Sequence, residues 1–470
     1  MRYVLGVLFL AVLLSPMVLR WAVGVSDQKA LPKDVLTLVI VTPHSEAIRR
    51  EFREAFSKYY QEKFGKAVTI DYRVYGGASE IKNVLGALRE TTYKANGTYD
   101  IDLAWGGGDA TFDVDLKPFL EGLALDPEFV KQVYPSPKLG GLKLYEESNP
   151  PLWYGTELSG FGIVFNRQVL KYLGVEPPAR WEDLTDPRYA GWVVLADPTR
   201  SSSARTAFMG VVEHTMAVAE EQGRGADRGW AEGMGLIRQI ASNVRDFNDG
   251  SGAIPALVSS GDVAAAMTID FYARSQIQFV GEDRLGYVEP ANSTVITPDP
   301  IGLLQGAPHR ELAKQFVEFV LSEQGQQLWD AKVGTKDGPR LVSLRRTPIR
   351  QSVFKDMSDL ADPVDPFAHV TSFNTSRART ATFSILEVMI QVSCIDVLND
   401  LRATRAAILS STHAAELDAK LAVFPFDQKE ALRRLDEYRK VSPVEKLVLI
   451  RKWTSEFRDE YRALRDEAQK

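Results

Sequence analysis

Short apolar runs alternate with amphipathic segments along the first 350 residues. Runs typical of strands, either continuous or alternating, lie at residues 36–41, 68–74, 101–105, 162–165, 192–196 and 263–269. The segment after Ser45 places Ile48, Phe52 and Phe56 on one helical stripe, and Gly65 ends it. Helices are also predicted after residues 203, 227 and 252, and a last α/β segment at 300–329. This order predicts a mostly parallel sheet with helices on both faces.

The pattern changes after about residue 350. Residues 362–366, with the sequence DPVDP, are typical of a linker, and the rest of the chain is helical. Capping boxes start two of the helices, Asp427 with Glu430 and Ser442 with Glu445. The last helix carries an apolar seam formed by Leu447, Ile450, Trp453, Phe457, Tyr461 and Leu464. We expect this seam to pack inside the protein; a partner-binding or oligomer seam is the alternative.

An apolar segment stands at the start of the chain. Residues 3–19 are almost wholly apolar and lie between Arg2 and Arg20. A positively charged start before a short apolar run is typical of a secretory signal, and a run of this length is also at the lower limit for a membrane anchor. We expect residues 1–24 to be a signal peptide or an N-terminal anchor, and the protein to be exported to the periplasmic or extracellular face.

Composition narrows the classes of function. The 470 residues carry a net charge of −6, which gives no electrostatic footprint for nucleic acid. The single cysteine, Cys394, permits no internal disulfide. The five histidines are scattered, and the sequence lacks the motifs of metalloproteases, α/β-hydrolases and nucleotide-binding folds. We therefore expect no enzyme; a hydrolase that uses Ser202 or Ser203 is the catalytic alternative.

Loops rich in glycine and hydroxyl side chains follow five of the predicted strands, at residues 42–45, 76–79, 106–109, 197–203 and 248–252. Ligands of open α/β sheets bind beyond the carboxyl ends of the strands, where helix N-termini offer N–H groups that favour anions. One such loop is ordinary turn chemistry, but five indicate a ligand cleft. The candidate ligand-binding residues in these loops are His44, Ser45, Gly77, Ser79, Gly107, Gly108, Ser202, Ser203 and Ser251.

Three segments carry a family resemblance. They read WEDLTDPRYAG at 181–191, VSSGDV at 258–263 and AKQFVEFVLSEQGQQLW at 313–329. Together they resemble the extracellular solute-binding proteins of ABC importers, in the branch that includes periplasmic ferric-binding proteins, and the resemblance covers about residues 36–345. It implies a monomer of two α/β lobes, joined by hinge crossings, that closes on a ligand and delivers it to a membrane permease.

The resemblance also sets expected boundaries. The first lobe is expected at residues 36–150 plus 295–350, the second at 151–294, and a helical C-terminal extension at 362–470. Turn-rich stretches at 135–151 and 290–300 are the expected chain crossings. The extension exceeds what the family fold needs. The alternative function is therefore a non-transport interaction or sensor module of the envelope that uses these helices as its partner surface.

Iron(III) is one ligand that the resemblance implies. Ferric-binding relatives hold Fe³⁺ with a histidine near the first strand, a glutamate, two adjacent tyrosines and an anion, and hard oxygen ligands suit that cation. His44 and Tyr272 stand at matching positions, and Asp109 is the carboxylate nearest the glutamate's position. Phe271 takes the place of the first tyrosine and cannot bind a metal.

Ser202, Ser203 and Ala204 match the anion-holding turn of that family more fully than the chain matches the family's iron ligands. Asp270, at the end of a predicted strand, is a further candidate ligand residue. The expected ligand is therefore Fe³⁺ with an anion, a ferric chelate, or a small anionic solute such as a phosphorylated or phosphonate compound.

Overall fold

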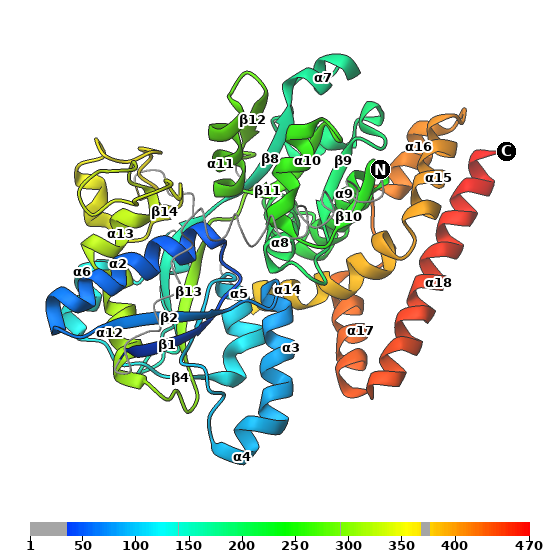
Figure 1. The fold of residues 1–470 in the computed structure, drawn as a ribbon. Coiled ribbons are helices and arrows are strands. Elements are labelled where there is room, and N and C mark those ends of the chain that lie inside the picture. The colour runs from blue at the N-terminus through cyan, green and yellow to red at the C-terminus, as the bar shows by residue number, and fades with distance from the viewer. Residues whose placement is uncertain (1–34, 140, 292, 368–376) are drawn as a thin grey trace, which may run out of the picture.

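The protein consists of two α/β lobes and a helical C-terminal region, as the computed structural model in Figure 1 shows. The structure describes residues 35–139, 141–291, 293–367 and 377–470. The predicted signal or anchor segment, residues 1–24, lies outside the described residues. The two-lobe α/β fold with a helical C-terminal region is confirmed.

A seven-stranded sheet forms the first lobe. Its strands run in the order β14–β7–β13–β3–β1–β2, with β4 paired to β13. Their bounds are β1 (Leu36–Val41), β2 (Val68–Arg73), β3 (Leu103–Trp105), β4 (Leu120–Glu121), β7 (Tyr154–Ser159), β13 (Thr297–Leu304) and β14 (Thr347–Pro348).

Helices cover both faces of this first sheet. On β1, Leu38 belongs to the core that includes Phe52 of α2 (Glu46–Phe64), whereas Val41 packs with Leu85 of α3 (Ala78–Leu88). Helices α12 (Arg310–Leu321) and α13 (Glu323–Asp330) pack beside α2. Shorter elements complete the lobe: α4 (Lys94–Asn96), α5 (Asp109–Thr111), α6 (Pro127–Val133), β5 (Lys138–Leu139) and β6 (Leu142–Lys143). Helix α2 begins after Ser45 and ends at Gly65, as the sequence predicts.

The second lobe contains a five-stranded sheet in the order β10–β9–β11–β8–β12. These strands are β8 (Phe161–Asn166), β9 (Val193–Ala196), β10 (Val244–Asn248), β11 (Ala265–Ile269) and β12 (Leu285–Val288). The helices of the lobe are α7 (Arg167–Leu173), α8 (Ser202–Glu221), α9 (Ala226–Ser242), α10 (Ile254–Ser260) and α11 (Asp270–Val280). Helices α8 and α9 pack closely against each other.

Both sheets are mixed, so the prediction of mostly parallel strands is wrong. In the first sheet β1 pairs in parallel with β2 and β3, but β13 runs antiparallel to β3, β4 and β7. In the second sheet β8 runs antiparallel to both β11 and β12. The physical reason is that strands which enter a lobe after a crossing come from the opposite end of the sheet. Hydrophobic periodicity carries no information about that direction.

The chain passes between the lobes at two places. Strand β7 pairs in the first sheet and β8 in the second, so the first crossing lies at Gly160 rather than in the expected stretch 135–151. All twelve residues of these two strands are buried, and only Gly160 separates the two strands, so no linker marks the change of sheet. The second crossing lies between β12 and β13, where the stretch 290–300 was expected to cross.

The C-terminal region packs mainly against the second lobe. It consists of α14 (Arg377–Ile390), α15 (Leu398–Leu409), α16 (Ala414–Leu421), α17 (Gln428–Lys440) and α18 (Pro443–Ala468). Helix α14 lies against α8 and α15 against α9 (Figure 1). The capping box of Ser442 and Glu445 is present. The apolar seam of α18 is buried except at Leu447, which is 62% exposed, so the seam does pack inside the protein.

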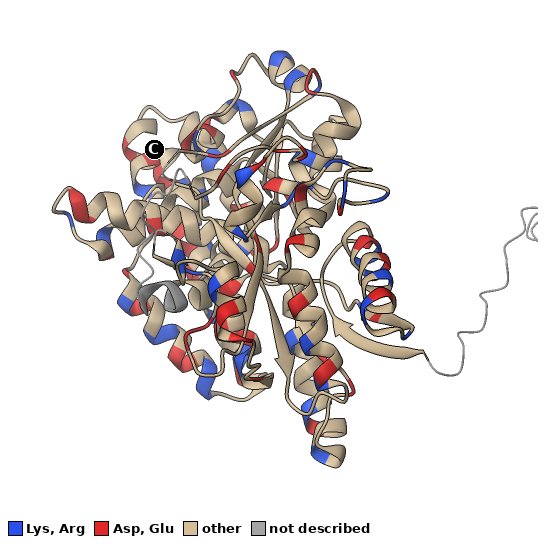
Figure 2. Ribbon diagram, turned by 90° about the vertical axis from the view of Figure 1, so that its left-hand side faces the viewer, with Lys and Arg blue, Asp and Glu red and all other residues tan. Residues whose placement is uncertain are grey.

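The surface charges and the helix lengths can be compared with those expected of a membrane protein or a strongly charged one. On the face shown in Figure 2, acidic and basic residues are interspersed along the helices. Among the described residues, no single helix has the length and apolar composition to cross a membrane. One helix pair, Thr382–Ile395 with Leu398–Leu409, passes that test only when its members are joined across a 62° bend.

Candidate functional site

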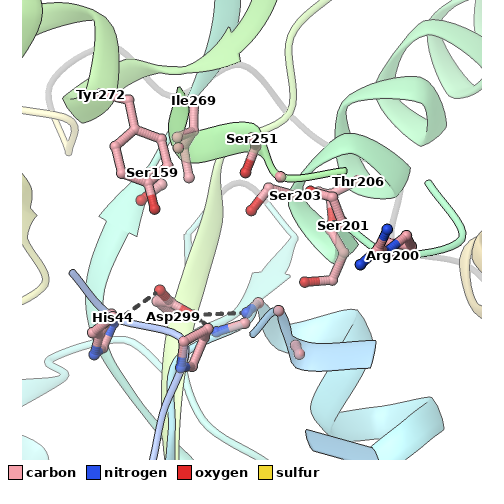
Figure 3. Close-up of a pocket in the computed structure, with 18 of the residues that line it drawn as sticks. His44, Ser159, Arg200, Ser201, Ser203, Thr206, Ser251, Ile269, Tyr272 and Asp299 are labelled. Carbon is pink, nitrogen blue, oxygen red and sulfur yellow. Dashed lines mark hydrogen bonds and ion pairs between the residues drawn. The ribbon is translucent and has the colours of Figure 1, made fainter. Parts of the chain in front are cut away.

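A cavity of about 330 Å³ lies between the two lobes. All five loops that the sequence singles out contribute to its lining, together with residues from strand ends (Figure 3). The first lobe supplies Pro43, His44, Gly76, Gly77, Ala78, Gly107 and Gly108 from loops, and the second supplies Arg200 to Ser203 and Asp249 to Gly252. The cavity therefore has walls from both lobes, as a ligand-induced closure requires.

Two helices of opposite lobes begin at this cavity. Helix α3 starts after Gly77, which makes no side-chain cap, and α8 starts after Ser201, whose hydroxyl accepts from the Ala204 N–H at 3.3 Å. Gly77 and Ala78 line the cavity on one side, and Ser202 and Ser203 on the other. A helix N-terminus carries a partial positive charge and free N–H groups. Two of them facing one cavity favour an anion there.

Four charged or titratable side chains form a polar cluster at the floor of the cavity. His44, Glu157, Asp299 and Arg346 are all buried. The Nε2 atom of His44 lies 3.4 Å from an Asp299 oxygen and 3.8 Å from a Glu157 oxygen. One terminal nitrogen of Arg346 lies 2.8 Å from Asp299 and 2.9 Å from Glu157, and it donates to the Ser159 hydroxyl at 2.8 Å. The two carboxylates thus share two cationic partners.

The pKa values of this cluster follow from burial and pairing. Burial raises the pKa of Asp299, but Arg346 and His44 outweigh it and hold that pKa far below its usual range. Burial lowers the pKa of His44, but hydrogen bonds with Asp299 and Glu157 outweigh it, so the pKa is raised overall. For Glu157 burial wins over Arg346, and its pKa is raised. Asp299 is therefore the firmly ionised member of the cluster.

An internal carboxylate occupies one of the predicted anion-binding loops. The backbone N–H groups of Gly107 and Gly108 both donate to Asp299, the second at 2.7 Å. Gly107 has φ of +115°, a conformation that glycine adopts readily, and this lets the two N–H groups converge on one oxygen. The loop at 106–109 does bind an anion, but that anion belongs to the protein itself. The N-termini of α3 and α8 remain as sites for an external one.

The aromatic pair at the start of α11 lies against the same cluster. Tyr272 lines the cavity, and its ring packs on that of Phe271 with a centroid separation of 4.2 Å. Burial raises the pKa of the Tyr272 phenol, although nearby Arg346 opposes this. Phe271, which is buried, lies under Arg346, with the guanidinium carbon 4.2 Å from the ring centroid. The ring thus supports a cation that belongs to the protein.

The structure brings most of the candidate residues to the cavity and leaves five outside its lining. His44, Gly77, Gly107, Gly108, Ser202, Ser203, Ser251 and Tyr272 line the cavity. Ser45 precedes α2, Ala204 lies in the first turn of α8, and Ser79 accepts a hydrogen bond from Arg205 at 3.4 Å. Asp109 starts the short helix α5, and Asp270 starts α11, where it accepts from the Phe271 N–H.

Three buried charged residues of the site escape the sequence analysis: Glu157, Asp299 and Arg346. Glu157 stands in a strand in which every residue is buried, and a charged residue in such a run was an available signal. Asp299 lies between Pro298 and Pro300 in a stretch interpreted as a crossing, although it forms part of β13. Arg346 directly precedes the two-residue strand β14, and no local pattern marks it.

At the rim of the cavity, Arg200 connects the two lobes. Its guanidinium forms an ion pair with Asp249 of the second lobe and lies 3.6 Å from Glu80 of the first. A side chain added at Gly77 would meet the carbonyl oxygen of Arg200 at 2.6 Å, so the lobes are in direct contact here. The ion pair of Arg200 with Asp249 is exposed, and solvent screens such pairs strongly. It can therefore open without a large cost.

Residues 128–336 match the protein family described as bacterial extracellular solute-binding protein. That segment of the chain is similar to the extracellular solute-binding proteins. The match begins in the first lobe, spans the second lobe completely and ends after α13. The resemblance predicted from sequence segments is thus confirmed, and the interlobe cavity is where this family fold would hold a solute.

Proteins that are similar to this chain carry names with different ligands. The phosphoglycerate transport regulatory protein PgtC of Salmonella typhimurium is 27% identical over 197 residues, which are 40% of this chain and 45% of PgtC. Iron uptake protein A1 of Synechocystis is 25% identical over 191 residues, 39% of this chain and 49% of that protein. A putative 2-aminoethylphosphonate-binding periplasmic protein of Salmonella typhimurium is 26% identical over 172 residues, 35% and 45% of the two chains. The chain spans about half the length of these relatives.

Solved structures agree with the two-lobe fold. The periplasmic binding protein AfuA from Actinobacillus pleuropneumoniae, with fructose-6-phosphate bound, superimposes with a TM-score of 0.52 at 20% identity, over 71% of this chain and 92% of AfuA. The periplasmic binding protein P5PA gives a TM-score of 0.55 at 19% identity, over 73% and 94% of the two chains. These likenesses support a periplasmic-binding-protein fold.

Proposed function

We propose that this protein is the solute-binding component of an ABC-type importer and that its ligand is a small anionic solute with a phosphate or phosphonate group. The main support for the proposal is that two helices from opposite lobes, α3 and α8, have their N-termini at the same cavity. Serine hydroxyls add donors on the second lobe. The relatives named for phosphoglycerate transport and for 2-aminoethylphosphonate binding support the same ligand class.

The charges around the cavity are compatible with an anion because the carboxylates there have cationic partners. Asp299 is paired with Arg346 and His44, and Asp249 with Arg200. Local N–H groups can then attract an anion although the whole chain has a net charge of −6. An organic part of the solute would meet Tyr272 and Ile269, which also line the cavity.

The proposed mechanism is closure. A solute that contacts Gly77 and Ala78 on one lobe and Ser202 and Ser203 on the other binds the closed form best, so binding shifts the population toward that form. The closed complex would then dock on a membrane permease. We propose an exported protein, periplasmic or at the extracellular face, in line with the relative named as periplasmic. We also propose that the protein is a monomer.

Thermal unfolding with a panel of solutes tests the ligand class. A ligand of the native state raises the free energy of unfolding by about 2.7 kcal/mol when it is present at 100 times its Kd. We expect stabilisation by phosphate- or phosphonate-bearing solutes, and loss of at least about tenfold in affinity in a double variant S202A/S203A. A matched control, S410A/S455A, removes two exposed hydroxyls outside the cavity. No stabilisation by any such solute would contradict the proposal.

Iron(III), with or without an anion, is the second candidate ligand. A ligand atom from each of His44, Glu157 and Asp299 lies within 4.8 Å of the other two, a spacing that could hold a metal ion. The relative named iron uptake protein A1 agrees with this candidate. Against it stand Phe271 at a tyrosine position and the cation Arg346 at the same carboxylates. The proposal of a metal-free anion is therefore the better supported.

A further inference from the structure

We propose that Arg346 is a built-in cation that takes the place of a metal ion among His44, Glu157 and Asp299, and thereby restricts the cavity to metal-free anionic solutes. This inference rests on the proposed function and deepens it, because it names the residue that decides between the two ligand classes. The residues of the cluster do not fit a resident metal while Arg346 is present, and the reasons are steric, electrostatic and chemical.

The guanidinium stands where a metal ion would have to bind. A metal held by the cluster must approach one oxygen of each carboxylate, and the oxygens available are Oδ2 of Asp299 and Oε1 of Glu157. A single terminal nitrogen of Arg346 already lies 2.8 Å from the first and 2.9 Å from the second. His44 Nε2 faces the same two oxygens, at 3.4 and 3.8 Å. Arg346 must therefore leave before a metal can enter.

Surrounding side chains hold the guanidinium in this position. Its carbon lies 4.2 Å from the ring centroid of Phe271 and 5.5 Å from that of Trp329, so aromatic rings contact the cation. The terminal nitrogen of Arg346 that contacts both carboxylates also donates a hydrogen bond to the Ser159 hydroxyl at 2.8 Å. Arg346 is only 1% exposed. Phe271 thus supports the guanidinium with its ring and has no phenol oxygen to bind a metal.

The charge of the cluster is balanced without a metal. Glu157 and Asp299 can supply two negative charges, and the guanidinium of Arg346 supplies a fixed positive charge in contact with both carboxylates. A buried cluster near neutrality has no charge that would attract a di- or trivalent cation. Removal of the guanidinium leaves two carboxylates and one imidazole without its positive charge. Two carboxylates and one imidazole are a donor set that binds transition metals.

Replacement of Arg346 by a neutral residue of similar reach should therefore create a metal site. We would titrate R346Q with Co²⁺, whose visible absorption reports coordination by nitrogen and oxygen, and count bound metal per chain by mass spectrometry. We expect about one Co²⁺ per chain and a gain in affinity on the order of 100-fold over the unmodified protein. Addition of H44Q to R346Q should abolish the gain and the absorption band.

Two further variants serve as controls. R345Q removes the neighbouring arginine, which is paired with Asp362 outside the cluster, and should gain no metal. R346K keeps a positive charge at the position and should also stay metal-free. A folded R346Q that gains no Co²⁺ affinity would overturn the inference.

The unmodified protein provides a test that does not depend on the folding of R346Q. If it binds Co²⁺ or Fe³⁺ stoichiometrically, and H44Q abolishes the binding, Arg346 does not exclude metals and the inference is wrong. Failure of the proposed function is a separate result. In that case no phosphate- or phosphonate-bearing solute would bind the unmodified protein, whatever R346Q does with metal.

Discussion

Arg205 and Glu387 form an ion pair of 2.9 Å that joins helix α8 of the second lobe to helix α14 of the C-terminal region. The same guanidinium lies 3.1 Å from Asp115 of the first lobe and stacks over the ring of Phe383 at 4.1 Å. Arg205 is buried and follows Ser202 and Ser203, which line the cavity, by less than one helical turn. One side chain therefore contacts both lobes and the helical extension beside the ligand site.

Loss of this guanidinium should be costly. Removal of Arg205 leaves Glu387 without its cation and Asp115 with Lys82 as its remaining cation, so we expect R205M to lower the free energy of unfolding by about 2 kcal/mol, measured by chemical denaturation. R433M is the matched control, because Arg433 pairs with Glu430 at 2.7 Å on the exposed surface of α17. The effect of R433M should be much smaller than that of R205M, because solvent screens the exposed pair. Equal effects of the two substitutions would contradict the role assigned to Arg205.

Helix α14 should respond to the ligand if the extension senses closure, which is the alternative function that the sequence suggested. Opening of the cleft must separate Asp115 from Arg205, and Glu387 is attached to the same guanidinium. We expect saturating solute to slow hydrogen exchange in α14. In E387Q we expect solute to slow this exchange less, while the affinity for solute changes little. Exchange in α14 that is the same with and without solute would argue against a sensor role.

Gly77 should control closure of the cleft. An added Cβ at this position would meet the backbone oxygen of Arg200, across the lobes, at 2.6 Å, so the lobes must shift apart to relieve the contact. We expect G77A to weaken solute binding by about tenfold or more in calorimetry and to leave the melting temperature without solute nearly unchanged. G86A, in the same helix and with nothing within 4 Å of the added atom, should bind as the unmodified protein does.

The protonation of His44 should make stability depend on pH in a defined direction. Burial lowers the pKa of His44, but hydrogen bonds with Asp299 and Glu157 raise it above the unfolded value of about 6.5. A raised pKa contributes stability that is fully present below pH 6.5 or so and is lost as pH rises through the folded value. The loss of stability in H44Q, measured by denaturation, should therefore be larger at pH 5.5 than at pH 9. A pH-independent effect would show that the pKa is not raised.

The sequence was sufficient to predict the parts of the site that are local. Glycine and serine at strand exits are visible in the chain, and all five of the predicted loops meet at the cavity. Glu157, Asp299 and Arg346 are far apart in sequence, and their meeting depends on the antiparallel return of β13 beside β7 and on β14 at the sheet edge. A pattern of hydrophobic positions does not specify such pairings. The position of the first crossing was missed for the same reason, because β7 and β8 are equally buried on either side of Gly160.

Because contacts between residues far apart in sequence cannot be predicted from local patterns, iron(III) stays among the ligands expected from the sequence. His44 and Tyr272 do lie at one cavity, so the positions taken from the resemblance are close in space. The cation that faces the carboxylates beside them comes from Arg346, some seventy residues beyond Tyr272 in the chain, and no motif predicts it. The site is thus similar in arrangement to what a metal site would need and differs in its charge.

Isothermal titration calorimetry in the presence of a strong chelator distinguishes a metal-free anionic ligand from iron. The protein would be stripped of metal, kept in excess EDTA and titrated with phosphoglycerate, 2-aminoethylphosphonate and a sugar phosphate in turn, with ferric citrate in chelator-free buffer as the comparison. We expect saturable binding of at least one of the phosphate or phosphonate compounds with EDTA present, and loss of that binding in S202A/S203A. Binding of ferric ion alone, with none of the anionic solutes bound in EDTA, would contradict this expectation.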